Sequence, residues 1–304
     1  MRITTPQITA LMHGSMNANS ERLGKLMQQM ATGERLLMPS DDPIASVRLL
    51  RVEREQASLS QYANNIANLS DSLSIQEANL SAASDTMLRA QDLLLWAANR
   101  GANSDEDLAA IASELNTLKD TIVSFINVRD EEGRYLFSGT LSDRPAVTFT
   151  EDDGYTLNGN DKYRQAAVAN GVLVEENVTA HQFFGGAPEF LNTLDELVQT
   201  LQAEGLDGND PAVGQQITDA LDKLDDTHGR ILGAITELGG RQNSLSLLAE
   251  SNADVSVVNE KIEGELSRLD YGSAAIDLSN YQLALQATQK TYLKINGLSL
   301  FAQM

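Results

Sequence analysis

The sequence predicts a mainly α-helical protein: an elongated antiparallel coiled-coil bundle built from both chain ends, with a small β-rich domain inserted in the middle. Three observations support this fold class. Apolar residues recur at heptad spacing near both ends, no proline occurs between Pro43 and Pro145, and only 5 % of the residues are aromatic. Abundant Leu, Ala, Ile and Val with few aromatic residues suit the packing of helices better than a large globular core.

The first predicted helix carries a heptad seam close to the start of the chain. Its apolar members alternate at three and four residues, which is the spacing of one face of a coiled-coil helix. Asn19 is the one polar member, and a single Asn in such a seam can fix the register at some cost in stability. The apolar members are Met12, Met16, Leu23, Leu26 and Met30.

A joint between two helices is predicted in the stretch GERLLMPSDDPIAS, residues 33–46. Gly33 weakens the first helix, and Pro39 disfavours the helical conformation in the residue before it. Asp42 is a good N-cap, and Pro43 fits the first helical position, where its missing N–H costs nothing. Pro39, Asp42 and Pro43 therefore mark the place where one helix stops and the next begins.

The second predicted helix is unusually long. It runs from Pro43 to Gly101, about 57 residues, and at ~1.5 Å per residue it would measure about 85 Å. Such a length is typical of coiled coils. From Tyr62 its seam continues without a slip through Ile66, Leu69, Leu73, Gln76, Leu80, Ala83, Met87, Ala90, Leu94 and Ala97.

A third helix is expected to fold back antiparallel on the second after a turn at Ala102 and Asn103. Ser104 is its predicted N-cap, and the acidic residues that follow it are favourable near the positive end of the helix dipole. We expect this helix to end near Gly133. Its seam is Leu108, Ile111, Leu115, Leu118, Ile122 and Phe125.

The character of the sequence changes between about Tyr135 and Gly186, where Thr, Val, Tyr and Phe become frequent. Short alternating runs there flank pairs of turn residues, which is the pattern of β-hairpins. We therefore predict a β-rich insert with hairpins at these pairs. The pairs are Asp153-Gly154, Asn158-Gly159 and Asn170-Gly171.

Helical sequence returns at Pro188, and a loop at residues 205–210 precedes another helix that starts at Pro211. The seam of that helix reaches Ala249, and Gly239-Gly240 predicts a bend in a helix connection. A further helix carries Val255, Val258, Ile262 and Leu269.

The last predicted helix follows Tyr271-Gly272 and carries a second terminal seam. The two terminal seams cannot be buried in one subunit except against each other, and a lone pair of amphipathic helices is marginal in water. We therefore expect both ends of the chain to meet other chains on assembly. The residues of this second seam are Leu278, Tyr281, Leu285, Tyr292 and Ile295, with Leu298, Leu300 and Phe301 closing the helix.

The chain is expected to form three nested domains, with both termini at the same tip. Residues 1–42 and 271–304 form a terminal coiled-coil domain, which is disordered in the monomer and lines an inner tube on assembly. Residues 43–137 and 188–270 form a long helical bundle, and residues 138–187 form the β-rich outer insert.

Composition excludes several classes of function. The chain has no cysteine, so disulfides and thiolate metal sites are excluded, and its net charge of −21 argues against a nucleic-acid partner. No apolar run approaches the ~20 residues of a membrane span, so we expect no membrane insertion. Lys and Arg exceed Asp and Glu in residues 1–54 and 271–304. The acidic middle is therefore expected to face solvent while the ends meet other chains.

No arrangement of residues predicts a catalytic, cofactor or metal site. His13, His181 and His228 lie far apart in the sequence, and the pair Asp41-Asp42 is explained by a helix cap. Zinc, Walker, nucleophile-elbow and dinucleotide patterns are absent from the sequence. We therefore expect a structural protein without cofactors, and not an enzyme.

Five stretches of the chain carry a signature: MRITTPQITALMHGSM, ATGERLLMPSDDPIAS, GRYLFSGT, ITELGGRQNSL and YGSAAIDLSNYQLALQATQKTYLKINGLSLF. Together they resemble the flagellin superfamily, and the resemblance covers both helical ends of the chain. Within it, the opening MRITTPQIT and the Pro43 that follows Asp41-Asp42 are closer to the hook-associated protein 3 (FlgL) family of hook–filament junction proteins than to flagellin.

The resemblance implies an axial part of the bacterial flagellum, secreted through the flagellar type III export system without a cleaved signal. It implies a homo-oligomeric ring between hook and filament, with hook-associated protein 1 and flagellin as neighbours. It also implies that a flagellar export chaperone binds the C-terminal helical region, residues 278–301.

Two other functions stay open on the sequence alone. A short flagellin would form the filament itself. A secreted coiled-coil adhesin or effector would bind a host ligand through the insert, and it would not need paired terminal seams.

Overall fold

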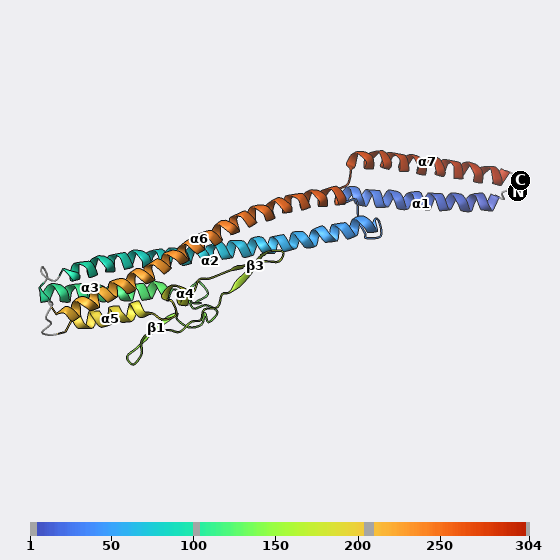
Figure 1. Ribbon diagram of the computed structural model, residues 1–304. Helices are drawn as coiled ribbons and strands as arrows, with labels where there is room; N and C mark the ends of the chain where they lie inside the picture. Colours follow the sequence, from blue (N-terminus) through green and yellow to red (C-terminus); the bar gives the residue numbers. More distant parts are fainter. Residues whose placement is uncertain (1–4, 100–103, 204–209, 302–304) are drawn as a thin grey trace. The chain divides into compact units, whose positions relative to one another are not determined.

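The computed structural model describes residues 5–99, 104–203 and 210–301, with side chains from residue 7 to residue 294 within these ranges. The described residues form seven helices and two small antiparallel sheets (Figure 1). The predicted class, mainly helical with a β-rich insert in the middle of the chain, is confirmed. None of the described helices is long and apolar enough to cross a membrane.

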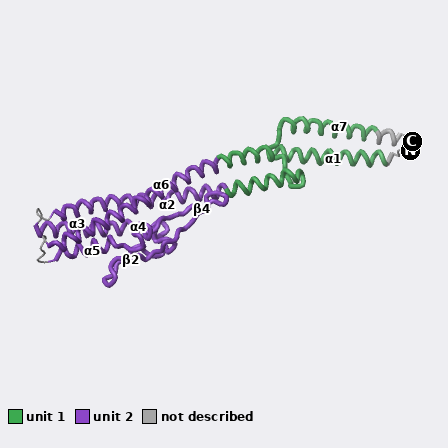
Figure 2. The backbone as a smooth tube through the Cα atoms, viewed as in Figure 1, with its two compact units in different colours: residues 1–58, 254–304 green, residues 59–253 purple. Residues whose placement is uncertain are grey.

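The chain divides into two compact units (Figure 2). Unit 1 comprises residues 1–58 and 254–304, and unit 2 comprises residues 59–253. The division falls within the two longest helices, α2 (Pro43–Ala98) and α6 (Pro211–Ser267), so each of these helices contributes to both units.

Unit 1 contains two pairs of helices. α1 (Thr5–Thr32) and α7 (Tyr271–Phe301) lie side by side and antiparallel, with the start of α1 and the end of α7 at the same end of the pair (Figure 1). The second pair consists of residues 43–58 of α2 and 254–267 of α6, which a hydrogen bond of 2.5 Å from Gln56 to Ser256 connects.

Unit 2 holds the hydrophobic core, and α2 supplies much of it. The predicted seam of this helix is confirmed, because every member from Ile66 to Ala97 is buried. The helix has 56 residues and begins at Pro43, as predicted. A heptad pattern of this length keeps one face of a helix turned toward its partners, so the core follows from the sequence spacing.

α3 (Asp105–Ile126) begins with the predicted N-cap. Ser104 and Asp107 form a capping box, in which each side chain accepts a hydrogen bond from the backbone of the other. The expected end near Gly133 is wrong, because the helix stops at Ile126. Asn127 exchanges two hydrogen bonds with the backbone of Val147, at 2.8 and 3.0 Å, which turns the chain into the insert.

Two of the three predicted hairpins are present. β1 (Val147–Thr150) pairs with β2 (Gly154–Leu157) across Asp153-Gly154, and β3 (Gln165–Ala169) pairs with β4 (Val172–Glu175) across Asn170-Gly171. Gly154 and Gly171 have positive φ, which these tight turns need.

The expected hairpin at Asn158-Gly159 is wrong. This pair lies between the two sheets and passes against Ser138, where a Cβ on Gly159 would stand only 2.8 Å from the Ser138 Cα. The glycine is therefore required for a close approach of two backbone segments and not for a turn.

Two helices follow the insert. The short helix α4 (Ala180–Phe184) was not predicted; the Thr179 side chain caps it, and Gly185 ends it in the left-handed conformation. α5 (Glu189–Leu201) starts directly after Pro188, as predicted, and buries its apolar face in the core of unit 2.

α6 corrects another expectation. The sequence predicted a bend at Gly239-Gly240 and a separate helix from Val255 onward, but one helix of 57 residues continues through both places. Arg241, directly after the glycines, forms ion pairs with Glu237 of the same helix and with Glu175 at the end of β4. These contacts hold the helix where two glycines would each weaken it by about 1 kcal/mol.

Candidate assembly surface and helix joint

The terminal seams face each other in unit 1. Met12, Met16, Leu23 and Met30 of α1 are half-buried, and Leu26 is buried. On α7, Leu278, Tyr281, Leu285 and Tyr292 are half-buried. The side chains of Ile295, Leu298, Leu300 and Phe301 lie outside the described residues.

A polar contact between the two terminal helices accompanies the apolar seam. The His13 Nε2 lies 3.2 Å from the Tyr292 hydroxyl, and the two rings meet edge to face with centroids 4.9 Å apart. The histidine is thus a packing residue between helices, which is one of the uses that its amphipathic ring allows.

A second set of apolar residues on the terminal helices points away from the seam. Leu11 and Leu293 are each 70 % exposed, and the others are exposed by more than half. Sequence reasoning missed these residues, although each lies beside or between seam residues in the sequence. The set, which we call the outer terminal residues, consists of Leu11, Met27, Ile276, Leu283 and Leu293.

The joint after α1 contacts the segment that leads from α6 into α7. The Arg35 amide donates to the Ser267 carbonyl at 2.7 Å, and the Leu269 amide donates to the Gly33 carbonyl at 2.9 Å. Gly33 has a φ of 75°, a left-handed conformation that ends α1. The two connections of unit 1 are therefore held together by backbone hydrogen bonds.

Arg35 strengthens this junction. Its guanidinium donates to the Leu266 carbonyl from Nε at 3.2 Å and from Nη2 at 3.0 Å, and its Nη1 lies 3.3 Å from the Asp42 carboxylate. One side chain thus satisfies an end carbonyl of α6 and contacts the N-cap of α2. No local sequence pattern indicates this role, because Leu266 lies 231 positions away.

Asp42 is the N-cap that the sequence predicted. Its Oδ1 accepts the Ala45 amide at 3.0 Å, and this hydrogen bond, together with Arg35, lowers the pKa of the Asp42 carboxyl. Pro43 is the first residue of α2, and Pro39 lies in the turn before it. Pro39, Asp42 and Pro43 therefore lie in the stretch between the end of α1 and the start of α2.

Asp41, in the same turn, makes a different set of contacts. Its Oδ1 lies 2.5 Å from the Lys25 Nζ of α1, and its Oδ2 accepts the amides of Leu37 and Met38 at 3.2 Å each. The hydrogen bond from Lys25 is the main reason why the pKa of Asp41 lies below its ordinary value. Asp41 thus fixes the turn to α1, while Asp42 fixes it to α2.

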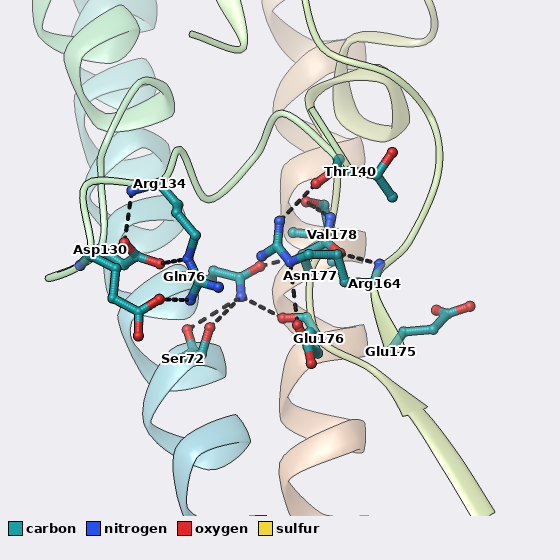
Figure 3. Close-up of polar contacts among 12 residues, drawn as sticks. Ser72, Gln76, Asp130, Arg134, Thr140, Arg164, Glu175, Glu176, Asn177 and Val178 are labelled. Atoms are coloured by element: carbon teal, nitrogen blue, oxygen red, sulfur yellow. Dashed lines mark hydrogen bonds and ion pairs between the residues drawn. The ribbon is translucent and has the colours of Figure 1, made fainter. Parts of the chain in front are cut away.

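A second polar site lies in unit 2, at the root of the insert (Figure 3). Gln76, the one polar member of the buried α2 seam, donates to the Glu176 carbonyl at 2.8 Å and accepts the Val178 amide at 3.0 Å. The Gln76 side chain therefore supplies partners for the Glu176 carbonyl and the Val178 amide, which follow the end of β4 and have no strand partner there. This explains why a polar residue interrupts the seam without leaving a buried group unpaired.

Arg164 completes the root of the insert. It donates to the Gly139 carbonyl at 2.7 Å and to the Glu176 carboxylate at 3.3 Å, while its own amide donates to the Asn177 side chain at 2.9 Å. These bonds join the two chain segments that enter and leave the insert.

A cavity of about 480 Å³ lies beside this root. Arg134 and Arg164 line it, but both are engaged, Arg134 with Asp130 at 2.8 Å and Arg164 with Glu176. Burial raises the pKa of Asp130, and the hydrogen bonds from Arg134 outweigh that effect and leave the pKa below its ordinary value. The two arginines of the cavity are therefore paired within the protein.

The histidine on the α6 seam also packs within the protein. The Nε2 of His228 lies 2.8 Å from the Ser84 hydroxyl of α2. Within the residues that the structure describes, no three His, Cys, Asp or Glu side chains come together as ligands for a metal ion.

Comparison with known protein families and curated proteins gives two kinds of match. The family model described as the bacterial flagellin N-terminal helical region matches residues 3–142. Flagellar hook-associated protein 3 of Escherichia coli (strain K12) is 28 % identical over 307 residues, covering 95 % of this chain and 95 % of that protein. Flagellar hook-associated protein 3 of Salmonella typhimurium is 29 % identical, covering 99 % of both.

Solved structures include a similar protein as well. A structure assigned to a flagellar hook-associated protein from Vibrio parahaemolyticus is 36 % identical, with a TM-score of 0.68. The match covers 75 % of this chain and 100 % of that chain.

Proposed function

The chain belongs to the family of flagellar hook-associated protein 3, and from this premise we propose that it is a structural part of the bacterial flagellum, the adapter that joins the hook to the filament. Its work is mechanical: it assembles through its terminal helices and catalyses no reaction. The protein is secreted to the flagellum and acts at the hook–filament junction.

The observation that carries the proposal is the uneven burial of apolar side chains. The core cluster belongs to unit 2, whereas the apolar side chains buried in the described part of unit 1 are only Leu26, Ala45, Val52 and Ala274. Contiguous exposed apolar surface on a protein marks a site of interaction. The exposed large apolar residues of unit 1 are Leu11, Met27, Met38, Ile44, Val47, Leu50, Val255, Val257, Val258, Ile262, Tyr271, Ile276, Leu283 and Leu293.

Burial of these residues would favour assembly. Burial of the five outer terminal residues against neighbouring subunits would contribute roughly 5–10 kcal/mol before the costs of association. Because unit 1 has so small a core of its own, these contacts are the main source of order for the terminal helices in our proposal.

The proposed assembly follows from this difference in burial between the two units. The terminal residues 1–42 and 271–304 form the inner tube of a homo-oligomeric ring, in which both terminal seams and the outer terminal residues are covered. Residues 43–137 and 188–270 stack laterally as rods, and residues 138–187 form the outer insert. Hook-associated protein 1 and flagellin are the neighbours on the two sides.

Export requires that the terminal helices do not bind other subunits before they reach the junction. We infer that the flagellar type III system exports the chain and that an export chaperone binds residues 278–301 beforehand. The exposed Leu283 and Leu293 support this part of the proposal, because α7 has apolar surface to protect away from its seam.

The alternatives are not favoured. The two relatives that align with nearly the whole chain are both hook-associated protein 3, and neither is a flagellin or an adhesin.

The test is filament attachment in the source bacterium. Deletion of the gene is expected to release filaments into the medium, the full chain is expected to restore attachment, and a chain that ends after residue 270 is expected not to. Filaments that stay attached in the deletion strain would overturn the adapter function. A deletion strain without filaments on the cell or in the medium would identify the chain as the filament subunit.

A further inference from the structure

The second helix pair of unit 1 buries polar groups beside Ala45 and Val52, while its large apolar residues at other positions are exposed. Gln56 contacts Ser256 between the helices, and Asn259 is only 5 % exposed. The Gln56 Oε1 and the Asn259 Nδ2 are buried without a hydrogen-bond partner among the described residues. Polar groups buried in this way do not favour the pair energetically, so its apolar residues serve another contact.

The outward face of residues 43–58 of α2 combines apolar and basic side chains, and we call it the basic face. Ile44, Val47 and Leu50 are exposed on it by 71, 59 and 49 %. Arg51 and Arg54 follow Val47 and Leu50 by four residues, which places them on the same side of the helix. Glu55, four residues after Arg51, is an acidic residue on this otherwise basic side. Neither guanidinium has an ion-pair partner within the described residues.

The outward face of residues 254–267 of α6 combines apolar and acidic side chains, and we call it the acidic face. Val258 and Ile262 are exposed on it. Asp254, Val258 and Ile262 are spaced four residues apart, so they lie on the same side of the helix. Glu265 lies three residues beyond Ile262, and Lys261 is the one basic residue on this side. Asp254 and Glu265 have no ion-pair partner in the described part of the chain.

We propose that the basic face of one copy of this chain binds the acidic face of the next copy. This inference rests on the proposed function, because it names the contact through which the copies of the ring meet. Each face offers exposed branched apolar residues and an excess of charge of one sign, and the other face offers an excess of the opposite sign. A second copy therefore supplies the matching surface, and no other partner is needed.

The geometry of the two faces also decides the kind of assembly. Each helix of the pair turns its other side toward its partner helix, so the basic and acidic faces of one copy are separate patches. An interface between two different patches is heterologous, and its repetition gives a ring or a helical array instead of a closed dimer. The charges fix the direction of the contact, since basic against basic would be repulsive.

Cysteine cross-linking tests this contact directly, because the chain has no cysteine of its own. Val47→Cys on the basic face and Val258→Cys on the acidic face are produced as two separate chains in one strain. Intact flagella are then treated with a short bifunctional maleimide. We expect a cross-linked dimer that contains one copy of each variant, and no such dimer from the secreted monomers at low concentration. Leu232→Cys, an exposed site of α6 in unit 2, replaces Val258→Cys in the control and is expected to give no dimer.

The outcomes separate this inference from the proposed function. Attached filaments without the mixed dimer, or with Val47→Cys linked to another flagellar protein, overturn the contact and leave the adapter function intact. Filaments that stay attached in the deletion strain overturn the adapter function itself.

A charge exchange provides the second test, which does not depend on a cross-linker. Arg51→Glu with Arg54→Glu is expected to reduce the number of attached filaments by about tenfold or more, because like charges would then face each other. Asp254→Lys with Glu265→Lys in the same chain is expected to restore attachment, since both faces have exchanged sign. A loss that the second pair of substitutions does not restore counts against the contact.

Discussion

The hydroxyl of Tyr271 donates a hydrogen bond to the carbonyl of Met30 at 3.1 Å, which ties the first residue of α7 to the last turn of α1. The same hydroxyl would stand 3.3 Å from a Cβ on Gly33. Tyr271 and Met30 are 241 positions apart in the chain. The two terminal helices therefore meet at the joint through the Tyr271 side chain, which packs where Gly33 has no side chain. The terminal pair is fixed where it leaves the rest of unit 1.

Gly33→Ala is expected to weaken this end of unit 1. The left-handed conformation costs a residue with a Cβ about 1–2 kcal/mol, and the new methyl group would also press on Tyr271. Hydrogen exchange should become faster at the amides of Arg35 and Leu269, which are bonded across the joint.

Gly14→Ala provides the matched control for that glycine. Gly14 lies within α1, and nothing stands within 4 Å of the position of its Cβ. The substitution should therefore slow exchange in α1, since Ala favours a helix by about 1 kcal/mol over Gly. Equal effects of the two substitutions would contradict the role given to the backbone of Gly33.

Asp42→Ala should loosen the start of α2. It removes the acceptor for the Ala45 amide and the ion pair with Arg35, so exchange at that amide is expected to become at least about fivefold faster. Asp42→Asn keeps a capping oxygen and loses only the charge, so it should have a much smaller effect at Ala45. An equally large effect of both variants would show that the charge matters more than the cap.

Acid should open the joint. The pKa values of Asp41 and Asp42 are lowered in the folded chain, by the hydrogen bonds from Lys25 and from the Ala45 amide respectively. Groups with depressed folded pKa values stabilise the fold above their unfolded values, here 3.8, and that stabilisation is lost as the pH falls through the lower folded values.

Pepsin, which is active in acid, can measure this opening. Cleavage within residues 33–42 should rise as the pH falls below 3.8, relative to cleavage at exposed sites in unit 2. The variant with Asp41→Asn and Asp42→Asn should be cleaved readily at higher pH and should show little pH dependence there. A wild-type joint that resists pepsin throughout this range would refute the assignment.

The buried ion pair between Lys119 and Asp195 should be costly to break. Lys119 of α3 is buried, contacts Asp195 of α5 and lies over the Tyr155 ring at 5.4 Å. Lys119→Met leaves the carboxylate without its partner and should reduce the free energy of unfolding of unit 2 by about 2–4 kcal/mol. Urea unfolding followed by circular dichroism measures the change.

The double variant separates the pair from its packing. Lys119→Met with Asp195→Leu removes both charges, and we expect it to be less destabilised than Lys119→Met alone. Additive losses would mean that the two side chains contribute independently.

Gln76 should control the attachment of the insert. Gln76→Leu fits a heptad position but leaves the Val178 amide and the Glu176 carbonyl without partners, at a cost of about 2–4 kcal/mol. Faster exchange at Val178, with little change at Ile122 in the core of unit 2, is the expected result. Gln76→Glu keeps an acceptor for Val178 and should protect that amide better than Gln76→Leu.

Much of the architecture could be predicted because its causes are local. The Asp42-Pro43 start of α2, the Ser104 cap of α3 and the hairpins at Asp153-Gly154 and Asn170-Gly171 each depend on residues a few positions apart. The heptad seam of α2 works in the same way over a longer stretch, because its repeat alone decides which face is buried.

The candidate site was predicted only in part. The seam residues and the positions Pro39, Asp42 and Pro43 could be named from spacing and capping rules. Arg35 and Tyr271 could not, because their partners Leu266 and Met30 are distant in the chain. The outer terminal residues could not be named either, because they lie outside the heptad positions of the two terminal seams.

The sequence by itself determined the fold class, the long helices, most helix starts and the family, because periodicity, caps and signature stretches are written in neighbouring residues. Only the tertiary structure decided that α6 runs through Gly239-Gly240, that α3 ends at Ile126 and that Gly159 serves a close approach. Each of these depends on a partner elsewhere in the chain, such as Glu175 for Arg241 or Val147 for Asn127. A local preference of about 1 kcal/mol is easily outweighed by such distant hydrogen bonds and ion pairs, and these exist only after the chain has folded.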